Sequence, residues 1–176
     1  MSKLFDLQNK NVLLTGASKG MGLAMAQGLV NHGANVVISS RKLDQCQKAV
    51  DTINESVKQE KAFAFSCNAS SKDELNALVD FSISKLGSIT TLVCNAGVNS
   101  FFGSMSEIDD ESYDKTMNTN VKSNHWLINM VSPSMKESGG GSIMITSSIA
   151  AFDASETLGT YSISKLAVLG LSLIHI

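Results

Sequence analysis

The chain has 176 residues, of which 43% are hydrophobic and 17% are charged, and its formal net charge at pH 7 is −2. This composition is that of an ordinary globular protein and excludes a disordered chain, and the lack of any basic run argues against nucleic-acid binding. No stretch approaches ~18 uninterrupted apolar residues, so no membrane span is expected. The length predicts a single domain over residues 1–176. Three cysteines without metal-ligand spacing predict reduced thiols in an intracellular protein and no metal site.

Short apolar runs rich in Val, Ile, Leu or Phe are typical of strands buried on both faces of a parallel sheet. They are Asn11–Thr15, Asn35–Ser39, Ala62–Ser66, Thr91–Cys94 and Ser142–Thr146. Between and after them lie helical patterns at about 21–32, 42–60, 71–86, 109–137 and 160–172. This repeated alternation predicts a three-layer α/β domain with a Rossmann-type, doubly wound parallel sheet. Gly33 and Gly87 stand where the glycine that ends a helix is expected.

A glycine-rich turn follows the first expected strand and opens the first expected helix. Its sequence is Thr15-Gly16-Ala17-Ser18-Lys19-Gly20-Met21-Gly22. Glycines at such a turn let the backbone approach a pyrophosphate, whose charge is favoured at the positive end of a helix. Three glycines alone indicate little, because a plain strand-to-helix turn can contain them too. Their place in the first strand–helix–strand unit favours a dinucleotide site.

The end of the second expected strand indicates which dinucleotide would bind. Recognition of a ribose 2′-hydroxyl usually places Asp or Glu ~20 residues after the glycines. Here the strand runs into Ser40-Arg41-Lys42, and the first acid, Asp44, already lies in a helix. Arg41 offers a planar fork of donors suited to a phosphate, and Lys19 can reach the same place. Two cations without a carboxylate predict NADP(H); the alternative is that Arg41 is a solvated charge at the start of a helix.

Tyr161 and Lys165 are one helical turn apart in the last expected helix, so their side chains share a face. A cation beside a phenol favours the ionised form and brings the phenol toward the range of acid–base catalysis near neutral pH. Ser148, just past the last expected strand, can donate a hydrogen bond to a carbonyl oxygen. Each residue alone is a chance pattern. Together with the glycine-rich turn they predict a proton-transfer site for hydride chemistry.

From residue 10 to about residue 170 these motifs resemble the short-chain dehydrogenase/reductase family. The resemblance implies a cofactor loop formed by Gly16, Ser18, Lys19, Gly20, Met21 and Gly22. It also implies cofactor contacts from Asn95, Ala96 and Gly97, although Cys94 replaces an Asn of the family motif. Asn68 stands where the family often has an Asp that contacts adenine, and an Asn can still hydrogen-bond the base.

The resemblance further implies a catalytic tetrad of Asn120, Ser148, Tyr161 and Lys165. In it Tyr161 is the acid/base, Asn120 holds a water of the proton relay, and Lys165 also binds the nicotinamide ribose. A subgroup of NADPH-dependent carbonyl reductases that act on ketones, aldehydes, α-dicarbonyls and retinoids is resembled by four segments: Ser39–Lys42, Val98–Gly103, Gly139–Ser142 and Ser147–Phe152. The phenylalanines expected at the substrate, or else in core or loop packing, are Phe101, Phe102 and Phe152. Cofactor contacts are also expected from Ser40, Arg41 and Tyr161.

The sequence after Lys165 departs from the family pattern, in which two more strands and a substrate-covering loop follow. Leu171–Ile176 does not resemble the usual end of that helix, and we expect no catalytic role for His175. We therefore expect a truncated sequence that lacks the family's last two strands. The printed chain is expected to be poorly soluble, because the last strand becomes an exposed edge, and nearly inactive.

Several alternatives stay open at this stage. The full-length form is expected to be a homo-oligomeric reductase, a dimer or tetramer, acting on a small carbonyl or alcohol substrate. The chain could instead be an NADP-binding fragment or regulatory isoform without turnover. It could also keep only an assembly surface with Met117, Val121 and Leu127 as contacts. The compartment, cytoplasmic or peroxisomal, is undecided because a peroxisomal address would lie at the C-terminus.

Overall fold

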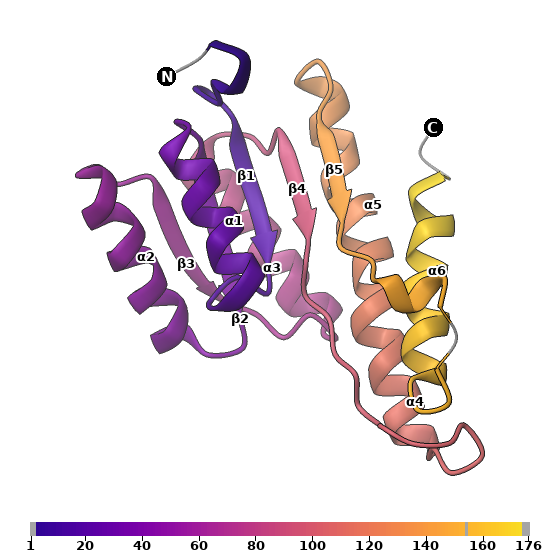
Figure 1. The fold of residues 1–176 in the computed structure, drawn as a ribbon. Coiled ribbons are helices and arrows are strands. Elements are labelled where there is room, and N and C mark those ends of the chain that lie inside the picture. Colours follow the sequence, from indigo (N-terminus) through magenta and orange to yellow (C-terminus); the bar gives the residue numbers. More distant parts are fainter. Residues whose placement is uncertain (1–2, 154, 174–176) are drawn as a thin grey trace.

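The computed structural model describes residues 3–153 and 155–173, and its centre is a parallel sheet (Figure 1). The five strands are β1 (Asn11–Thr15), β2 (Asn35–Ser40), β3 (Ala62–Ser66), β4 (Thr91–Cys94) and β5 (Ser142–Ile145). They are arranged in the order β3-β2-β1-β4-β5, and all neighbours are parallel. The direction of winding reverses between β1 and β4, which creates the switch point where such sheets bind ligands. The prediction of a doubly wound sheet is confirmed.

Helices cover both faces of this sheet and complete three layers (Figure 1). They are η1 (Lys3–Phe5), α1 (Gly20–Asn31), α2 (Leu43–Val57), α3 (Lys72–Leu86), α4 (Asp110–Met117), η2 (Asn118–Lys122), α5 (Ser123–Glu137), η3 (Ile149–Ala151) and α6 (Gly159–Leu173). Gly33 and Gly87 follow α1 and α3 with φ of 101° and 79°, a region that glycine adopts readily. The predicted helix ends at these glycines are therefore confirmed.

Alternating side chains of the strands divide the interior into two hydrophobic cores. Leu13 and Leu92 belong to the core that contains residues of α3, α5 and α6. Val12, Leu14 and Val93 belong to the core on the side of α1 and α2. Because the strands bury residues on both faces, their sequences read as continuous apolar runs.

The helix expected over residues 109–137 is interrupted, so this part of the prediction was wrong. α4 ends at Met117 and α5 begins at Ser123, and the π-helical segment η2 lies between them. There the Ser123 N–H donates to the carbonyl of Asn118, five residues back. A π-helical turn adds one residue without any polar or glycine signal, so the hydrophobic period does not reveal it. Leu127, expected at an assembly surface, is instead fully buried in a core.

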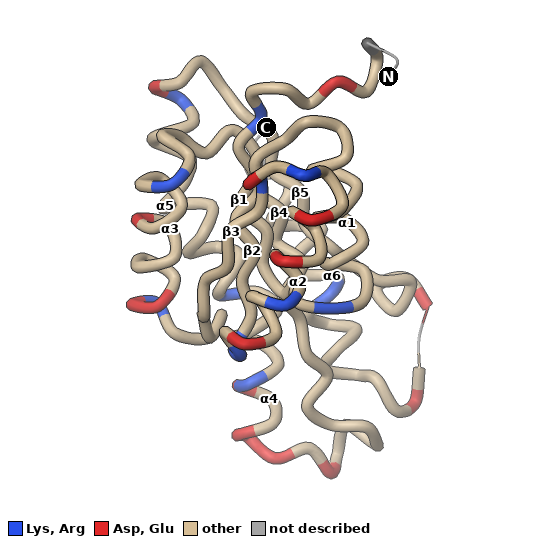
Figure 2. Tube along the Cα trace, turned by 90° about the vertical axis from the view of Figure 1, so that its left-hand side faces the viewer, with Lys and Arg blue, Asp and Glu red and all other residues tan. Residues whose placement is uncertain are grey.

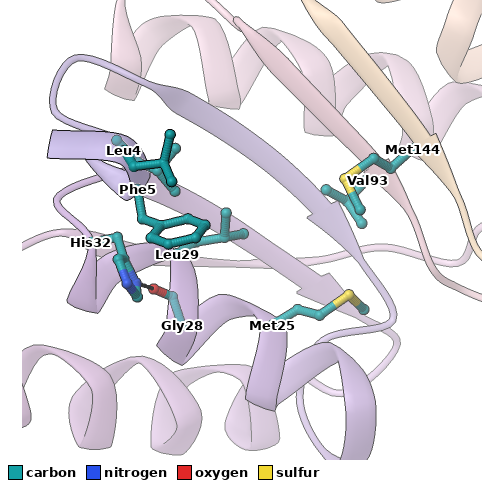
Figure 3. A pocket seen from close by; sticks show the side chains of 9 residues that line it. Leu4, Phe5, Met25, Gly28, Leu29, His32, Val93 and Met144 are labelled. Atoms are coloured by element: carbon teal, nitrogen blue, oxygen red, sulfur yellow. Dashed lines mark hydrogen bonds between the residues drawn. The ribbon is translucent and has the colours of Figure 1, made fainter. Parts of the chain in front are cut away.

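β5 is an edge of the sheet in the part of the chain that the structure describes, where it pairs with β4. On the α1 side of this edge lies an apolar groove of about 380 Å³ (Figure 3). Phe5 comes to it from η1, Met25 and Leu29 from α1, Val93 from β4 and Met144 from β5. The Met144 side chain is 54% exposed. The last strand was expected to be an exposed edge of the sheet, and β5 is such an edge in the described part of the chain.

Basic and acidic residues both occur along the trace, on several helices and loops (Figure 2). Among the described residues, no helix is long and apolar enough to cross a membrane. The same residues contain no group of three or more His, Cys, Asp or Glu side chains arranged to hold a metal ion. His175 lies outside the described residues.

Candidate active site

The glycine-rich turn lies at the carboxyl end of β1 and packs against the loop that follows β4. A Cβ atom on Gly16, whose φ is +66°, would lie 2.8 Å from the Cα atom of Ala96. A Cβ atom on Gly22 would lie 2.7 Å from Ala17 Cα and 2.8 Å from Asn95 Nδ2. Real Cβ atoms essentially never approach other atoms so closely. The shape of the turn therefore requires glycine at both positions.

The start of α1 fits the pyrophosphate of a dinucleotide. Lys19 occupies the N-cap position in an extended conformation, and no side chain caps the N–H groups of the first turn. By contrast, Ser71 caps α3 through its side-chain oxygen. The uncapped N–H groups and the helix dipole suit an anion. Gly20, with φ of +57°, faces open space, Ser18 is half-buried, and Lys19 and Met21 are exposed beside it.

Asn95 ties the glycine turn to the ends of β4 and β5. Its Nδ2 donates to the carbonyls of Gly16 and Thr15 at 2.9 and 3.2 Å, and its Oδ1 accepts from Thr146 Oγ1 at 3.3 Å. Thr15 Oγ1 accepts from the N–H groups of Asn95 and Ala96, both at 3.2 Å. The sequence did not identify Thr15. The neighbouring Cys94 is buried in the core, and this burial raises the pKa of its thiol to about 12.

The residues expected at the adenosine end lie at the carboxyl ends of β2 and β3. Ser40 Oγ and Cys46 Sγ are 3.0 Å apart, and the Arg41 carbonyl accepts from Ser66 Oγ at 3.2 Å. The Arg41 guanidinium is exposed and, within the described chain, has no side-chain or backbone partner. The Oδ1 atom of Asn68 accepts from the Ser70 N–H at 3.1 Å. The side-chain NH2 group of Asn68 therefore remains available to donate to an adenine base.

α6 brings Tyr161 and Lys165 together as the sequence predicted. The Nζ atom of Lys165 is 5.7 Å from the centroid of the Tyr161 ring. Lys165 is only 5% exposed, and its Nζ donates to the carbonyl of Thr146 at 2.8 Å. Burial lowers the pKa of this lysine. Ser147 Oγ donates to the Lys165 carbonyl at 2.8 Å, and Ser148 Oγ accepts from the Ala150 N–H at 3.2 Å, which leaves the Ser148 hydroxyl proton available.

Asn120 is fully buried in the π-helical segment, and its side chain connects two other parts of the chain. Its Oδ1 accepts from the Val98 N–H and its Nδ2 donates to the Val98 carbonyl, both at 2.8 Å. Its Nδ2 also donates to Ser164 Oγ at 2.9 Å, and Ser164 donates to the Tyr161 carbonyl at 2.7 Å. Asn124 Nδ2 donates to the Asn120 carbonyl at 2.7 Å. The Asn120 side chain thus holds the loop after β4 against α6.

Gly97 lies where these residues converge. A Cβ atom there would be 3.2 Å from Lys165 Nζ and 3.4 Å from Asn120 Oδ1. Of the residues predicted for the site, Gly97, Asn120, Tyr161 and Lys165 are thus connected by these contacts. Ser164 was missed from the sequence, although its place beside Lys165 in the Tyr161–Lys165 motif was a usable signal.

The phenylalanines expected near the substrate differ in their burial. Phe102 and Phe152 are 72% and 77% exposed, and Ile149, close to Phe152 in the sequence, is 78% exposed. Phe101 is half-buried and lies against Gly103. Packing in the core is therefore excluded for Phe102 and Phe152. These two side chains provide exposed apolar surface in the segments that follow β4 and β5.

A family model for short chain dehydrogenase matches residues 10–174. The chain belongs to this family. Members of this family are oxidoreductases that use a nicotinamide cofactor. The human protein "Dehydrogenase/reductase SDR family member 4" is 38% identical over 175 residues, and the match covers 98% of this chain and 61% of the relative. Its namesake from Caenorhabditis elegans is 35% identical over 168 residues, with 94% and 63% covered.

Solved structures of short-chain dehydrogenases have the same fold. A 7α-hydroxysteroid dehydrogenase complexed with NADH and 7-oxo glycochenodeoxycholic acid superposes with a TM-score of 0.90 at 35% identity, over 95% of this chain and 64% of that one. An NAD⁺-bound xylitol dehydrogenase gives 0.88 at 25% identity, over 94% and 63%. The chain thus spans about three fifths of the length of these short-chain dehydrogenases.

Proposed function

We propose that this short-chain dehydrogenase, at the full length of its relatives, is an NADPH-dependent oxidoreductase. It interconverts a ketone or aldehyde and the corresponding alcohol, with Tyr161 as the acid/base. The observation that carries the proposal is the buried Lys165, which stands 5.7 Å from the Tyr161 ring on α6 and beside Gly97. The nicotinamide, when bound, supplies or accepts the hydride. Relatives named as dehydrogenases and reductases support this class of reaction.

Each member of the catalytic group has a distinct task. Lys165 lies beside Tyr161 on α6, and the Tyr161 phenol would give a proton to the developing alkoxide in reduction and take one in oxidation. Ser148 can donate its hydroxyl proton to the substrate oxygen, because its oxygen accepts from the Ala150 N–H and its proton has no acceptor among the described residues. Asn120 orients α6 through Ser164, whose hydroxyl donates to the Tyr161 carbonyl.

The acid/base role is tested by Tyr161→Phe, which removes only the phenol oxygen. NADPH consumption with a ketone substrate should fall at least about 100-fold, the range expected for general acid–base catalysis. The affinity for NADPH, measured by fluorescence titration, should stay within about threefold, because the substitution removes only the phenol oxygen. A threefold change corresponds to RT ln 3, a small part of the binding free energy. Tyr113→Phe is the matched control at an exposed tyrosine. A Tyr161→Phe variant with unchanged turnover would contradict the assignment.

NADPH rather than NADH is proposed because Arg41 and Lys19 are exposed cations at the turns where the adenosine end would lie. Arg41→Ala should weaken NADPH binding by about tenfold or more, since a charge-assisted phosphate contact is worth over ~1.4 kcal/mol. NADH binding should barely change. Lys48→Ala, which removes the same charge from the exposed face of α2, is the control. Equal losses of both cofactors in Arg41→Ala would refute the 2′-phosphate contact.

A second candidate, cofactor binding without turnover, concerns the 176-residue chain itself. It is favoured by the exposure of Phe102, Phe152 and Ile149, because a reacting carbonyl placed beside them would remain in contact with water. This candidate predicts an NADPH-dependent fluorescence change of the 176-residue chain without consumption of NADPH. An unchanged fluorescence would instead leave only an assembly role.

A further inference from the structure

Three hydrogen bonds connect the glycine-rich turn to Lys165 through one threonine. The Gly16 carbonyl accepts from Asn95 Nδ2 at 2.9 Å, and Asn95 Oδ1 accepts from Thr146 Oγ1 at 3.3 Å. The carbonyl of the same Thr146 accepts from Lys165 Nζ at 2.8 Å. Thr146 stands directly after β5, and its N–H donates to the Cys94 carbonyl at 3.0 Å. This threonine therefore contacts the cofactor side with its side chain and the catalytic side with its backbone.

Lys165 depends on this contact because its ammonium is buried without a carboxylate partner among the described residues. Its Nζ donates to the Thr146 carbonyl, and the Tyr161 ring, at 5.7 Å, and Gly97 also lie near it. Hydrogen bonds from a charged donor are roughly twice as strong as neutral ones, and their loss in a buried site penalises the charged form. Small movements of the Thr146 carbonyl will therefore change both the position and the charge of Lys165.

We propose that Thr146 is a positioning residue for Lys165, and that its hydroxyl bond to Asn95 sets the Thr146 carbonyl relative to the glycine-rich turn. This inference deepens the proposed function, since Lys165 serves the acid/base there. In this arrangement the turn that would receive the pyrophosphate and the lysine beside the acid/base belong to one hydrogen-bonded unit. Displacement of the turn is then transmitted to the ammonium through Asn95 and Thr146.

The test measures Lys165 directly and needs neither cofactor nor turnover. Amine acylation of the folded 176-residue chain is followed by mass spectrometry over a pH series, with the exposed Lys136 as internal reference. Thr146→Val keeps the β-branched shape but loses the hydroxyl. The midpoint of the Lys165 profile should move to lower pH, which raises its labelling rate below the midpoint by about threefold to tenfold. Thr146→Ser keeps the hydroxyl and should retain the parent midpoint.

A second variant covers the case in which Thr146→Val does not fold. Asn95→Ala breaks the same connection from the other side and should move the Lys165 midpoint in the same direction. The double variant should show no shift beyond that of Asn95→Ala alone, because both changes remove one interaction. An unchanged midpoint in Thr146→Val or Asn95→Ala, or an equal shift in Thr146→Ser, would overturn the inference. Loss of turnover in Tyr161→Phe is scored separately, so either proposal can fail alone.

Discussion

Removal of the Asn120 carboxamide should cost the fold more than any other single polar truncation proposed for this site. The side chain is fully buried and makes three hydrogen bonds, two with the backbone of Val98 and one with Ser164. At about 1 kcal/mol net for each bond, Asn120→Ala loses roughly 3 kcal/mol. The Val98 N–H and carbonyl are then left without partners, which brings the expected loss to about 3–4 kcal/mol.

Urea unfolding measures this loss against matched variants. With an m value of about 2 kcal/mol/M, the midpoint of Asn120→Ala should fall by roughly 1.5–2 M. Ser164→Ala, which removes one of these three hydrogen bonds and the Ser164 bond to the Tyr161 carbonyl, should lose about 2 kcal/mol. Asn129→Ala, at an exposed asparagine of the next helix, should stay within about 0.5 kcal/mol of the parent. If Asn120→Ala were no less stable than Asn129→Ala, the buried network described here would be wrong.

Two further substitutions test the glycine-rich turn and the buried thiol. Gly22→Ala should destabilise the fold by about 1–3 kcal/mol, because the added Cβ would lie 2.8 Å from Asn95 Nδ2. Gly28→Ala, in the same helix, meets nothing within 4 Å and should stabilise the fold by up to about 1 kcal/mol. Equal urea midpoints for the two variants would contradict this packing. The Cys94 thiol has its pKa raised from 9.0 to about 12 by burial, so its contribution to stability is complete below pH 9 and is lost as the pH rises toward 12. Between pH 8 and pH 10 the parent should therefore lose about 1.4 kcal/mol more than Cys94→Ala in urea titrations, and a pH-independent difference would disprove the thiol's part.

Features that depend on neighbouring residues in the sequence were predicted well. The strands were recognised because the parallel sheet buries both faces, and Tyr161 and Lys165 were paired because one helical turn separates them. The glycine turn was located for the same reason, since its geometry is decided within a few residues of the end of β1. The roles of these residues in catalysis and cofactor binding stay predictions.

Features that depend on distant contacts could not be predicted. The two partners of the Asn120 side chain, Val98 and Ser164, lie 22 and 44 residues away. Thr146 meets Asn95 from 51 residues away, and a threonine at the end of a strand carries no sequence signal for that contact. The interruption of the expected helix at Asn118–Lys122 was missed because the helical period of the sequence does not record the contacts of Asn120 with Val98 and Ser164.

The π-helical segment also makes the number of residues between α4 and α5 important, independently of their identity. Removing one residue from Asn118–Lys122 would restore regular α-helical bonding and would suit the helix taken alone. It would also rotate α5 by about 100° relative to α4, because one residue corresponds to that angle in an α-helix. Leu127, Ile128 and Val131 would then leave the core they now fill. A single-residue deletion here would therefore be far more damaging than most substitutions at the same positions.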